Sequence, residues 1–271
     1  MKTFQHPLWG FELTYPDSWV HASHEGIDGF APDMTAFAAA DFDSAQAAHL
    51  LVRGEWNGYR EPIAPRWNQY ITKLSIMLGA KRLGSAPFRI GDAAGFEAEI
   101  QMPRKRQRRL WVGILARETV ILHFTVSHAF DVRSEIEPIA TQIIASLKFP
   151  PQTEGIRANP RGIPLPPGYT VTDPLSLIPD IPAPENWQAY TGGSDIGALQ
   201  AFYYRELPNF GWEILEFIPY PNQVEINFAR LSIHRDGSSA TLGILPTTHK
   251  QPRGDIVIQY DRPSPKSEQQ A

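Results

Sequence analysis

Hydrophobic and polar residues alternate, or β-branched residues cluster, in six segments of the first 149 residues. Both patterns are typical of β-strands. In the first segment we expect Phe11, Leu13 and Tyr15 to share one face. Pro16 should end the pairing because it has no N–H to donate, with Trp19 packed just beyond the turn. The six predicted strands are residues 11–15, 35–40, 48–56, 94–102, 108–116 and 119–127.

Two stretches in this part of the chain carry apolar residues three and four positions apart, which predicts amphipathic helices. The first covers residues 65–78 and ends at Gly79. The second covers residues 134–147 and opens with Ser134-x-x-Glu137, the pattern of a capping box. Each helix has one apolar stripe, so we expect each to bury one face.

A different composition begins at residue 150. Residues 150–186 contain ten prolines, which excludes a long helix or a central strand. The apolar residues among them favour an ordered strap over a flexible tether. After the strap we expect a helix capped by Ser194, then a meander of strands at residues 212–217, 223–231, 240–245 and 255–260. Residues 235–238 read as the hairpin turn of this meander.

These elements predict an α+β protein of two domains. The first is an antiparallel-sheet α/β/α sandwich at residues 1–149. The ordered strap at 150–186 leads to a smaller domain at 187–261 with one helix and a four-stranded antiparallel meander. Residues 262–271 are polar and are expected to form a disordered tail.

Composition narrows the function classes. The chain of 271 residues is 42% hydrophobic, so we expect a soluble globular protein, and its net charge of -4 argues against a nucleic-acid or membrane-surface partner. The chain has no cysteine, which excludes disulfides, thiolate nucleophiles and cysteine-ligated metals. The first ten residues lack the apolar stretch of a signal peptide, so the cytoplasm is the expected location.

Two segments resemble known families. Phe11-x-Leu-x-Tyr-Pro-x-x-Trp19, a hairpin around Lys105 and a closing helix ending Ala-Ser146-Leu-Lys-Phe149 resemble the PsbP-like superfamily, which includes the Mog-type Ran-binding proteins. This resemblance covers about residues 8 to 149. It implies an α/β/α sandwich and a docking or accessory role, and it implies no catalytic residues.

The second half is similar to a small domain of bacterial lipoproteins and uncharacterised proteins. The resemblance spans about residues 180 to 260 and rests on Ala201-Phe-Tyr-Tyr-Arg-Glu-Leu-Pro-x-x-Gly211-Trp212. It implies a helix followed by a meander and carries no activity.

The strongest charge feature is a run between two predicted strands in which five of six residues are cationic. Such a run could bind phosphate, a nucleic-acid backbone or an acidic patch on a protein. Alternatively, it forms a solvated hairpin whose arginines pair with Glu97 and Glu99 on the neighbouring strand. The candidate binding residues are Arg104, Lys105, Arg106, Arg108 and Arg109.

No catalytic motif is found. His21 and His24 do not have the spacing of a metalloprotease helix, and we expect polar loop residues there. We expect His123 to take part in packing or surface hydrogen bonding. A hydrolase would need these histidines to meet carboxylates in a pocket. We expect no metal and no cofactor.

The leading hypothesis is a non-enzymatic docking or accessory protein whose partner is another protein, with an acidic surface of that partner as the candidate contact. The alternative is a small-ligand binding protein with an aromatic-lined cleft between sheet and helix or between domains. The aromatic residues that could line such a cleft in the first half are Trp56, Tyr59, Trp67, Tyr70 and Trp111.

Overall fold

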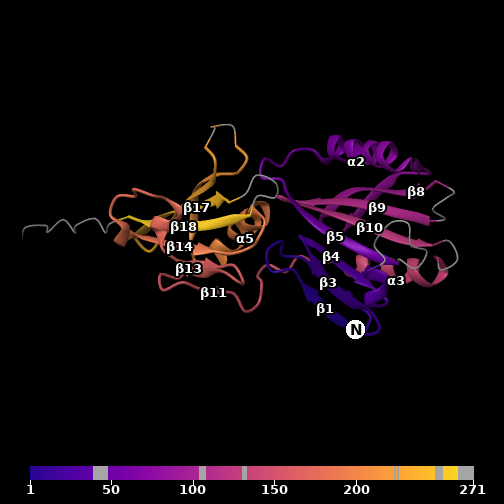
Figure 1. The fold of residues 1–271 in the computed structure, drawn as a ribbon, viewed down its shortest axis with the longest axis horizontal. Helices are drawn as coiled ribbons and strands as arrows, with labels where there is room; N and C mark the ends of the chain where they lie inside the picture. Colours follow the sequence, from indigo (N-terminus) through magenta and orange to yellow (C-terminus); the bar gives the residue numbers. More distant parts are fainter. Residues whose placement is uncertain are drawn as a thin grey trace, which may run out of the picture. The chain divides into compact units, whose positions relative to one another are not determined.

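The computed structural model describes residues 1–38, 48–103, 108–129, 133–222, 224, 226–247 and 253–261. The chain divides into two compact units, Met1–Pro150 and Pro151–Ala271. Each unit has its own antiparallel sheet and its own helices (Figure 1). The expected α+β class is therefore confirmed.

The first unit is built on an eight-stranded sheet with the order β3-β4-β5-β10-β9-β8-β6, in which β7 also pairs with β8. All of its pairings are antiparallel. The strands are β3 Val20–His24, β4 Ile27–Ala31, β5 His49–Trp56, β6 Lys81–Arg82, β7 Ala86–Ile90, β8 Ala93–Gln101, β9 Arg108–Arg117 and β10 Val120–Ala129.

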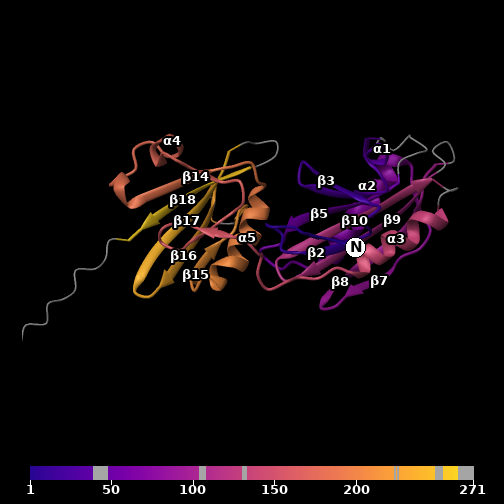
Figure 2. The same cartoon turned by 90° about the horizontal axis from the view of Figure 1, so that it is seen from below.

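A helix lies on each face of this sheet, as Figures 1 and 2 show. Helix α2 (Ile63–Leu78) packs Trp67 and Ile71 against one face of β8, β9 and β10. Helix α3 (Arg133–Ala145) contacts β10 and β5 from the opposite side. Since side chains alternate along a strand, successive residues of β8 and β9 face different helices. The predicted α/β/α sandwich is formed in this way.

The opening segment has the expected role. Strand β2 (Glu12–Tyr15) pairs with β1 (Lys2–Gln5), which the sequence did not predict. Phe11 and Leu13 are fully buried, and Trp19 is also buried beyond the turn. The N–H of Trp19 donates to the carbonyl of Pro16 at 3.0 Å, which closes the turn.

One predicted strand is wrong. Residues 34–38 form a short helix, α1 (Met34–Ala38), in place of the start of a strand at 35–40. The carboxylate of Asp33 accepts the N–H of Ala36 at 2.8 Å and so satisfies one free donor at the helix start. Phe37 of α1 packs over Gly29 of β4, where a Cβ would fall 2.3 Å from the ring. Residues 39 and 40 lie outside the described residues.

The second unit contains a six-stranded sheet with the order β13-β14-β18-β17-β16-β15. Helix α5 (Ile196–Asn209) contacts β15 and β17, and its buried residues include Leu199, Phe202 and Leu207. The remaining elements are β11 Arg157–Ala158, β12 Pro164–Leu165, β13 Thr170–Thr172, α4 Pro174–Leu177, the 3₁₀ turn η2 Pro184–Asn186, β14 Trp187–Thr191, β15 Glu213–Ile218, β16 Ala229–Arg235, β17 Ser238–Pro246 and β18 Gly254–Tyr260.

The second sheet therefore has two strands more than expected. Strand β13 comes from the proline-rich segment, and β14 directly follows that segment. Strand β14 contains no proline, so it can pair on both of its edges. The proline-rich segment is also tied to this unit by side chains, because Asn159 donates to the hydroxyl of Tyr260 at 2.8 Å and Tyr169 donates to the carbonyl of Gly254 at 2.6 Å.

Two local predictions in this unit are wrong. The described residues from 222 to 228 do not form a strand, because the side chain of Asn222 accepts the N–H of Ile226 and donates to the carbonyls of Ile226 and Phe228. The helix cap is Asp195, whose carboxylate accepts two N–H groups of the first turn, and not Ser194. The hairpin turn after Arg235 is confirmed.

Candidate binding groove in the first unit

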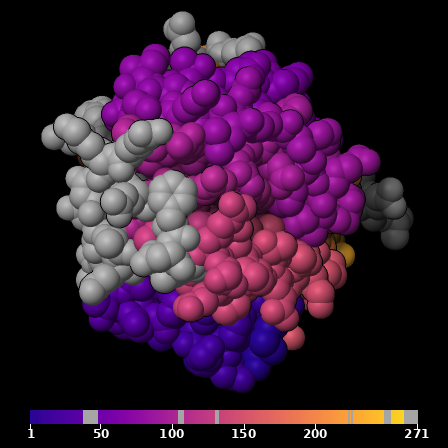
Figure 3. Space-filling view, turned by 90° about the vertical axis from the view of Figure 1, so that its right-hand side faces the viewer, coloured from indigo at the N-terminus to yellow at the C-terminus, as the bar shows by residue number. Residues whose placement is uncertain are grey.

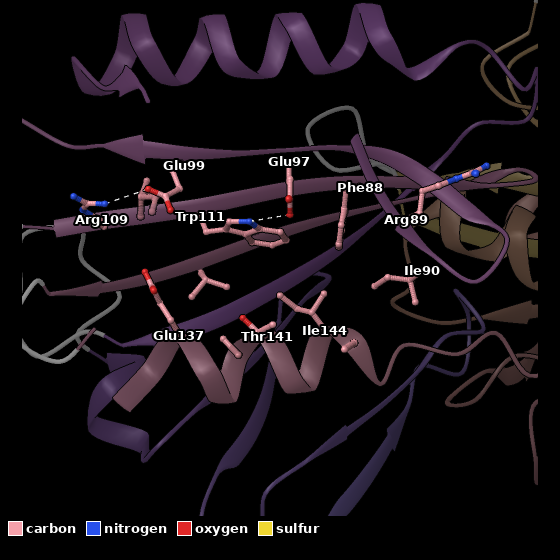
Figure 4. Close-up of a pocket in the computed structure, with 14 residues that line it drawn as sticks. Phe88, Arg89, Ile90, Glu97, Glu99, Arg109, Trp111, Glu137, Thr141 and Ile144 are labelled. Atoms are coloured by element: carbon pink, nitrogen blue, oxygen red, sulfur yellow. Dashed lines mark hydrogen bonds and ion pairs between the residues drawn. The ribbon is translucent and has the colours of Figure 1, made fainter. Parts of the chain in front are cut away.

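A groove of about 350 Å³ lies between α3 and the sheet face formed by β7, β8, β9 and β10. Figure 4 shows its walls, with the strands on one side and the turns of α3 on the other. In Figure 3 the segment that contains α3, coloured salmon, is exposed at the surface beside the purple segment that contains these strands. We call this feature the α3 groove.

Aromatic and aliphatic side chains form one wall of the α3 groove. Phe88 and Ile90 both face it because they alternate with Arg89 along β7 (Figure 4). The rings of Phe88 and Trp111 meet edge to face, with centroids 5.4 Å apart and planes at 86°. Trp111 reaches over Gly113, where a Cβ would come within 2.6 Å of the indole. Because residue 113 has no side chain, the indole of Trp111 has room to lie in the groove wall.

Charged side chains at one end of the α3 groove neutralise one another. The carboxylate of Glu99 accepts from Arg109 at 3.1 Å and lies 3.6 Å from the guanidinium of Arg133. Glu137 accepts from Arg133 at 2.7 Å and lies 3.0 Å from His128. Such partly exposed ion pairs contribute little stability, about 0–1 kcal/mol each. They do cancel the charge of two of the three carboxylates that line the groove.

The third carboxylate, Glu97, differs from the other two. It is half-buried and accepts the indole N–H of Trp111 at 3.2 Å (Figure 4). Within the part of the chain that the structure describes, it has no cationic partner. A second hollow of about 470 Å³ adjoins it and shares Glu97, Glu99 and Trp111 with the groove. Glu97 thus lies where the two hollows meet.

The basic run is only partly described. Residues 104–107 lie outside the described residues, so the contacts of Arg104, Lys105 and Arg106 are not part of this structure. The side chain of Arg108 is 1% exposed, and its Nη2 donates to the hydroxyl of Ser127 at 2.7 Å. Arg109 makes the cross-strand ion pair with glutamate that the solvated-hairpin alternative expects. Arg108 therefore belongs to the interior of the first unit and Arg109 to the α3 groove.

The first pair of histidines lies away from the groove. His21, in β3, is 3.1 Å from the carboxylate of Asp28 in β4, and Ser23 donates to the same oxygen at 2.5 Å. Ser23 also lies 3.4 Å from the Nε2 atom of His21, the nitrogen that faces Asp28. A nucleophile triad uses different ring nitrogens for serine and carboxylate. His24 is exposed. This group has the geometry of a cross-strand polar cluster.

His123 pairs with Glu55 at 2.7 Å on the face of the sheet that α2 covers. Burial acts to raise the pKa of Glu55, but His123 and Arg66 outweigh it and lower that pKa. Neither His21 nor His123 lines the α3 groove or the adjoining hollow. No group of three metal-ligating side chains occurs among the described residues. The convergence that a hydrolase would need is therefore not present in the described residues.

The aromatic residues predicted to line a cleft separate into different places. Trp111 lines the α3 groove, whereas Trp67 and Tyr70 pack between α2 and the sheet. Phe88 was missed because β7 follows Gly84 and contains Pro87, and only the alternation of Phe88 and Ile90 around Arg89 marks it as a strand.

No protein-family model and no curated protein matches the chain. Solved structures with a similar fold include PsbP (CyanoP) of Synechocystis, at 14% identity over 55% of this chain and 92% of that chain, with a TM-score of 0.42. The Ran-binding protein Mog1p of Saccharomyces cerevisiae matches at 8% identity over 55% and 94%, with a TM-score of 0.37. A protein of Bacteroides thetaiotaomicron matches at 11% identity over 90% and 86%, with a TM-score of 0.39.

The α/β/α sandwich of the first unit rests on its own sheet order and on the helices that contact the sheet. The similarity to the solved structures is a likeness of fold alone. No helix among the described residues is both long enough and apolar enough to cross a membrane.

Proposed function

We propose that this chain is a non-enzymatic docking protein that holds a segment of a partner protein in the α3 groove. The observation that carries the proposal is the pair of adjoining hollows, of about 350 and 470 Å³, which share the half-buried Trp111. Aromatic residues in such positions are enriched among the energetic anchors of protein interfaces.

The form of the site favours a protein segment over a small molecule. A small-molecule site is usually one concave pocket of roughly 300–1,000 Å³ that surrounds its ligand. Here two hollows share Glu97, Glu99 and Trp111, and the second also borders the segment from Leu83 to Ala86. An extended segment can place successive anchors in both hollows, which a compact ligand cannot do.

The basic run remains a second proposed contact. Arg104, Lys105 and Arg106 belong to the connection between β8 and β9, the strands that carry Glu97 and Trp111. Cations there would meet an acidic patch of the same partner and would mainly speed association. Arg108 is not part of this proposal because its side chain is buried.

Two exposed residues of α3 allow a matched test. Thr141 lines the α3 groove, whereas its neighbour Gln142 is exposed and does not. Thr141→Trp should fill the groove without touching the core, and Gln142→Trp adds the same side chain one position away. Proteins captured from native lysate by the wild-type chain are purified, and their affinity for both variants is measured.

We expect the partner to bind Gln142→Trp like the wild type and to bind Thr141→Trp about tenfold more weakly or worse. Equal affinities for both variants would overturn the proposal. Thermal stabilisation by a metabolite, about 2.7 kcal/mol at 100 times its Kd, lost only in Thr141→Trp, would instead support the small-ligand alternative.

A further inference from the structure

We infer that Glu97 binds a cationic side chain of the docked segment, namely an arginine whose guanidinium lies against the aromatic wall of the α3 groove. This inference rests on the proposed function and names the chemistry of the anchor. Three observations support it: the charge state of the groove, the orientation of Glu97, and the aromatic side chains beside it.

The charge balance of the groove leaves one carboxylate without a counterion. Glu99 and Glu137 share Arg109 and Arg133 as partners. Glu97 has no cation within hydrogen-bond distance among the described residues. Arg89 also lines the groove, but no hydrogen bond or ion pair joins it to Glu97 among the described residues. Glu97 is therefore the carboxylate of the groove that is open to a cation from a partner.

The orientation of Glu97 is set before any partner binds. The indole N–H of Trp111 donates to Oε2 of Glu97 at 3.2 Å, which holds the carboxylate beside the aromatic wall and leaves Oε1 for another donor. An arginine fits this arrangement better than a lysine, because the planar guanidinium can donate to a carboxylate and stack on an aromatic face at the same time. The apolar stem of the arginine would lie along Phe88.

The aromatic wall adds a preference for positive charge. The face of an indole or phenyl ring carries partial negative charge, so a guanidinium within about 6 Å of the ring centroid is attracted to it. Trp111 and Phe88 both line the groove beside Glu97. An apolar side chain could also pack there, but it would leave the half-buried carboxylate without a counterion. An acidic side chain would be repelled.

The test uses the full chain and two small probes of the same shape. N-acetyl-arginine N-methylamide carries the guanidinium, and the citrulline derivative replaces it with a neutral urea. Each is titrated while the indole N–H signal of Trp111 is followed by NMR, with that signal assigned by its loss in Trp111→Phe. The variants are Glu97→Gln, which keeps an acceptor for the indole and removes the charge, and Glu135→Gln, which removes an exposed carboxylate of α3 outside the groove.

We expect the arginine probe to shift the Trp111 signal with a Kd of about 1–30 mM. Citrulline should bind about three- to tenfold more weakly, and Glu97→Gln should weaken the arginine probe by a similar factor. Glu135→Gln should leave its affinity unchanged.

Equal binding of the two probes, or of the arginine probe to wild type and Glu97→Gln, would overturn the inference. Absence of any shift of the Trp111 signal by either probe would overturn it as well. Docking of a segment in the groove is judged separately by Thr141→Trp and Gln142→Trp, so failure of the arginine anchor is distinguishable from failure of the proposed function.

Discussion

His49 should make the first unit lose stability between neutral and acidic pH. Its side chain is 2% exposed at the start of β5, opposite Ser127 of β10. Within the described residues, neither ring nitrogen has a hydrogen bond of normal geometry. Burial and then the nearby charge of Arg108 lower its pKa from 6.5 to about 4, while the backbone of Ala36 acts weakly in the opposite direction.

The size of the effect follows from this shift. In the unfolded chain His49 binds a proton below about pH 6.5, whereas in the folded unit it stays neutral until about pH 4. Between these values the unfolded state binds more protons, so the free energy of unfolding rises with pH. The contribution of His49 to the free energy of unfolding is complete above pH 6.5 and is lost as the pH falls toward 4. A difference of 2.5 pKa units (6.5 minus 4) corresponds to about 3 kcal/mol.

The assay compares wild type with His49→Phe, which keeps a buried ring that does not titrate. Urea unfolding is measured across pH 4 to 6.5 and followed by the indole N–H signal of Trp111 in the NMR spectrum. This signal reports on the first unit, which matters because a chain of two compact units need not unfold in one step. The wild type should lose about 3 kcal/mol more than His49→Phe over this interval. His24→Phe, at an exposed histidine, should behave like the wild type. Identical pH dependence of wild type and His49→Phe would refute the reasoning.

Two further predictions concern the second unit, measured by urea unfolding at neutral pH. Asn222→Ala should lower the free energy of unfolding by about 1–3 kcal/mol, because the backbone groups of Ile226 lose their side-chain partners; an unchanged midpoint would count against this role. Glu206→Ala should lower the free energy of unfolding by about 3–5 kcal/mol, because it removes the buried carboxylate that accepts from Arg205 and from the N–H of Thr153. Glu206→Gln should recover part of this loss. Equal stability of wild type and Glu206→Ala would contradict the account.

The sequence predicts the central strands of the first unit because their patterns are local. Strands β5, β8, β9 and β10 are rich in apolar and β-branched residues, and all four were expected near their observed bounds. Strand β4 was missed because Asp28 and Gly29 are typical of turns. In the structure Asp28 is buried and satisfied by His21 and Ser23 of the neighbouring strand. These hydrogen bonds form only when β3 and β4 pair, and the residue pattern of β4 alone does not show that pairing.

The α3 groove could be predicted only in part. Trp111 was among the aromatic residues expected to line a cleft, and Glu97 and Glu99 were placed on one face by their spacing. Glu137 was assigned to a helix cap, whereas its carboxylate meets Arg133 and His128. The groove needs α3 to lie against the face of the sheet next to β7, and this arrangement depends on the sheet order and not on either segment alone.

The most direct test of docking in the α3 groove is the response of two indole N–H signals to a purified partner. Trp111 lines the groove, whereas Trp212 of the second unit donates to the carbonyl of Gly162 and serves as an internal reference. We predict that the partner shifts or broadens the Trp111 signal, that the Trp212 signal keeps its position, and that Thr141→Trp needs about tenfold more partner for the same response, or gives none. Saturating binding of the partner with the Trp111 signal unchanged would contradict the account.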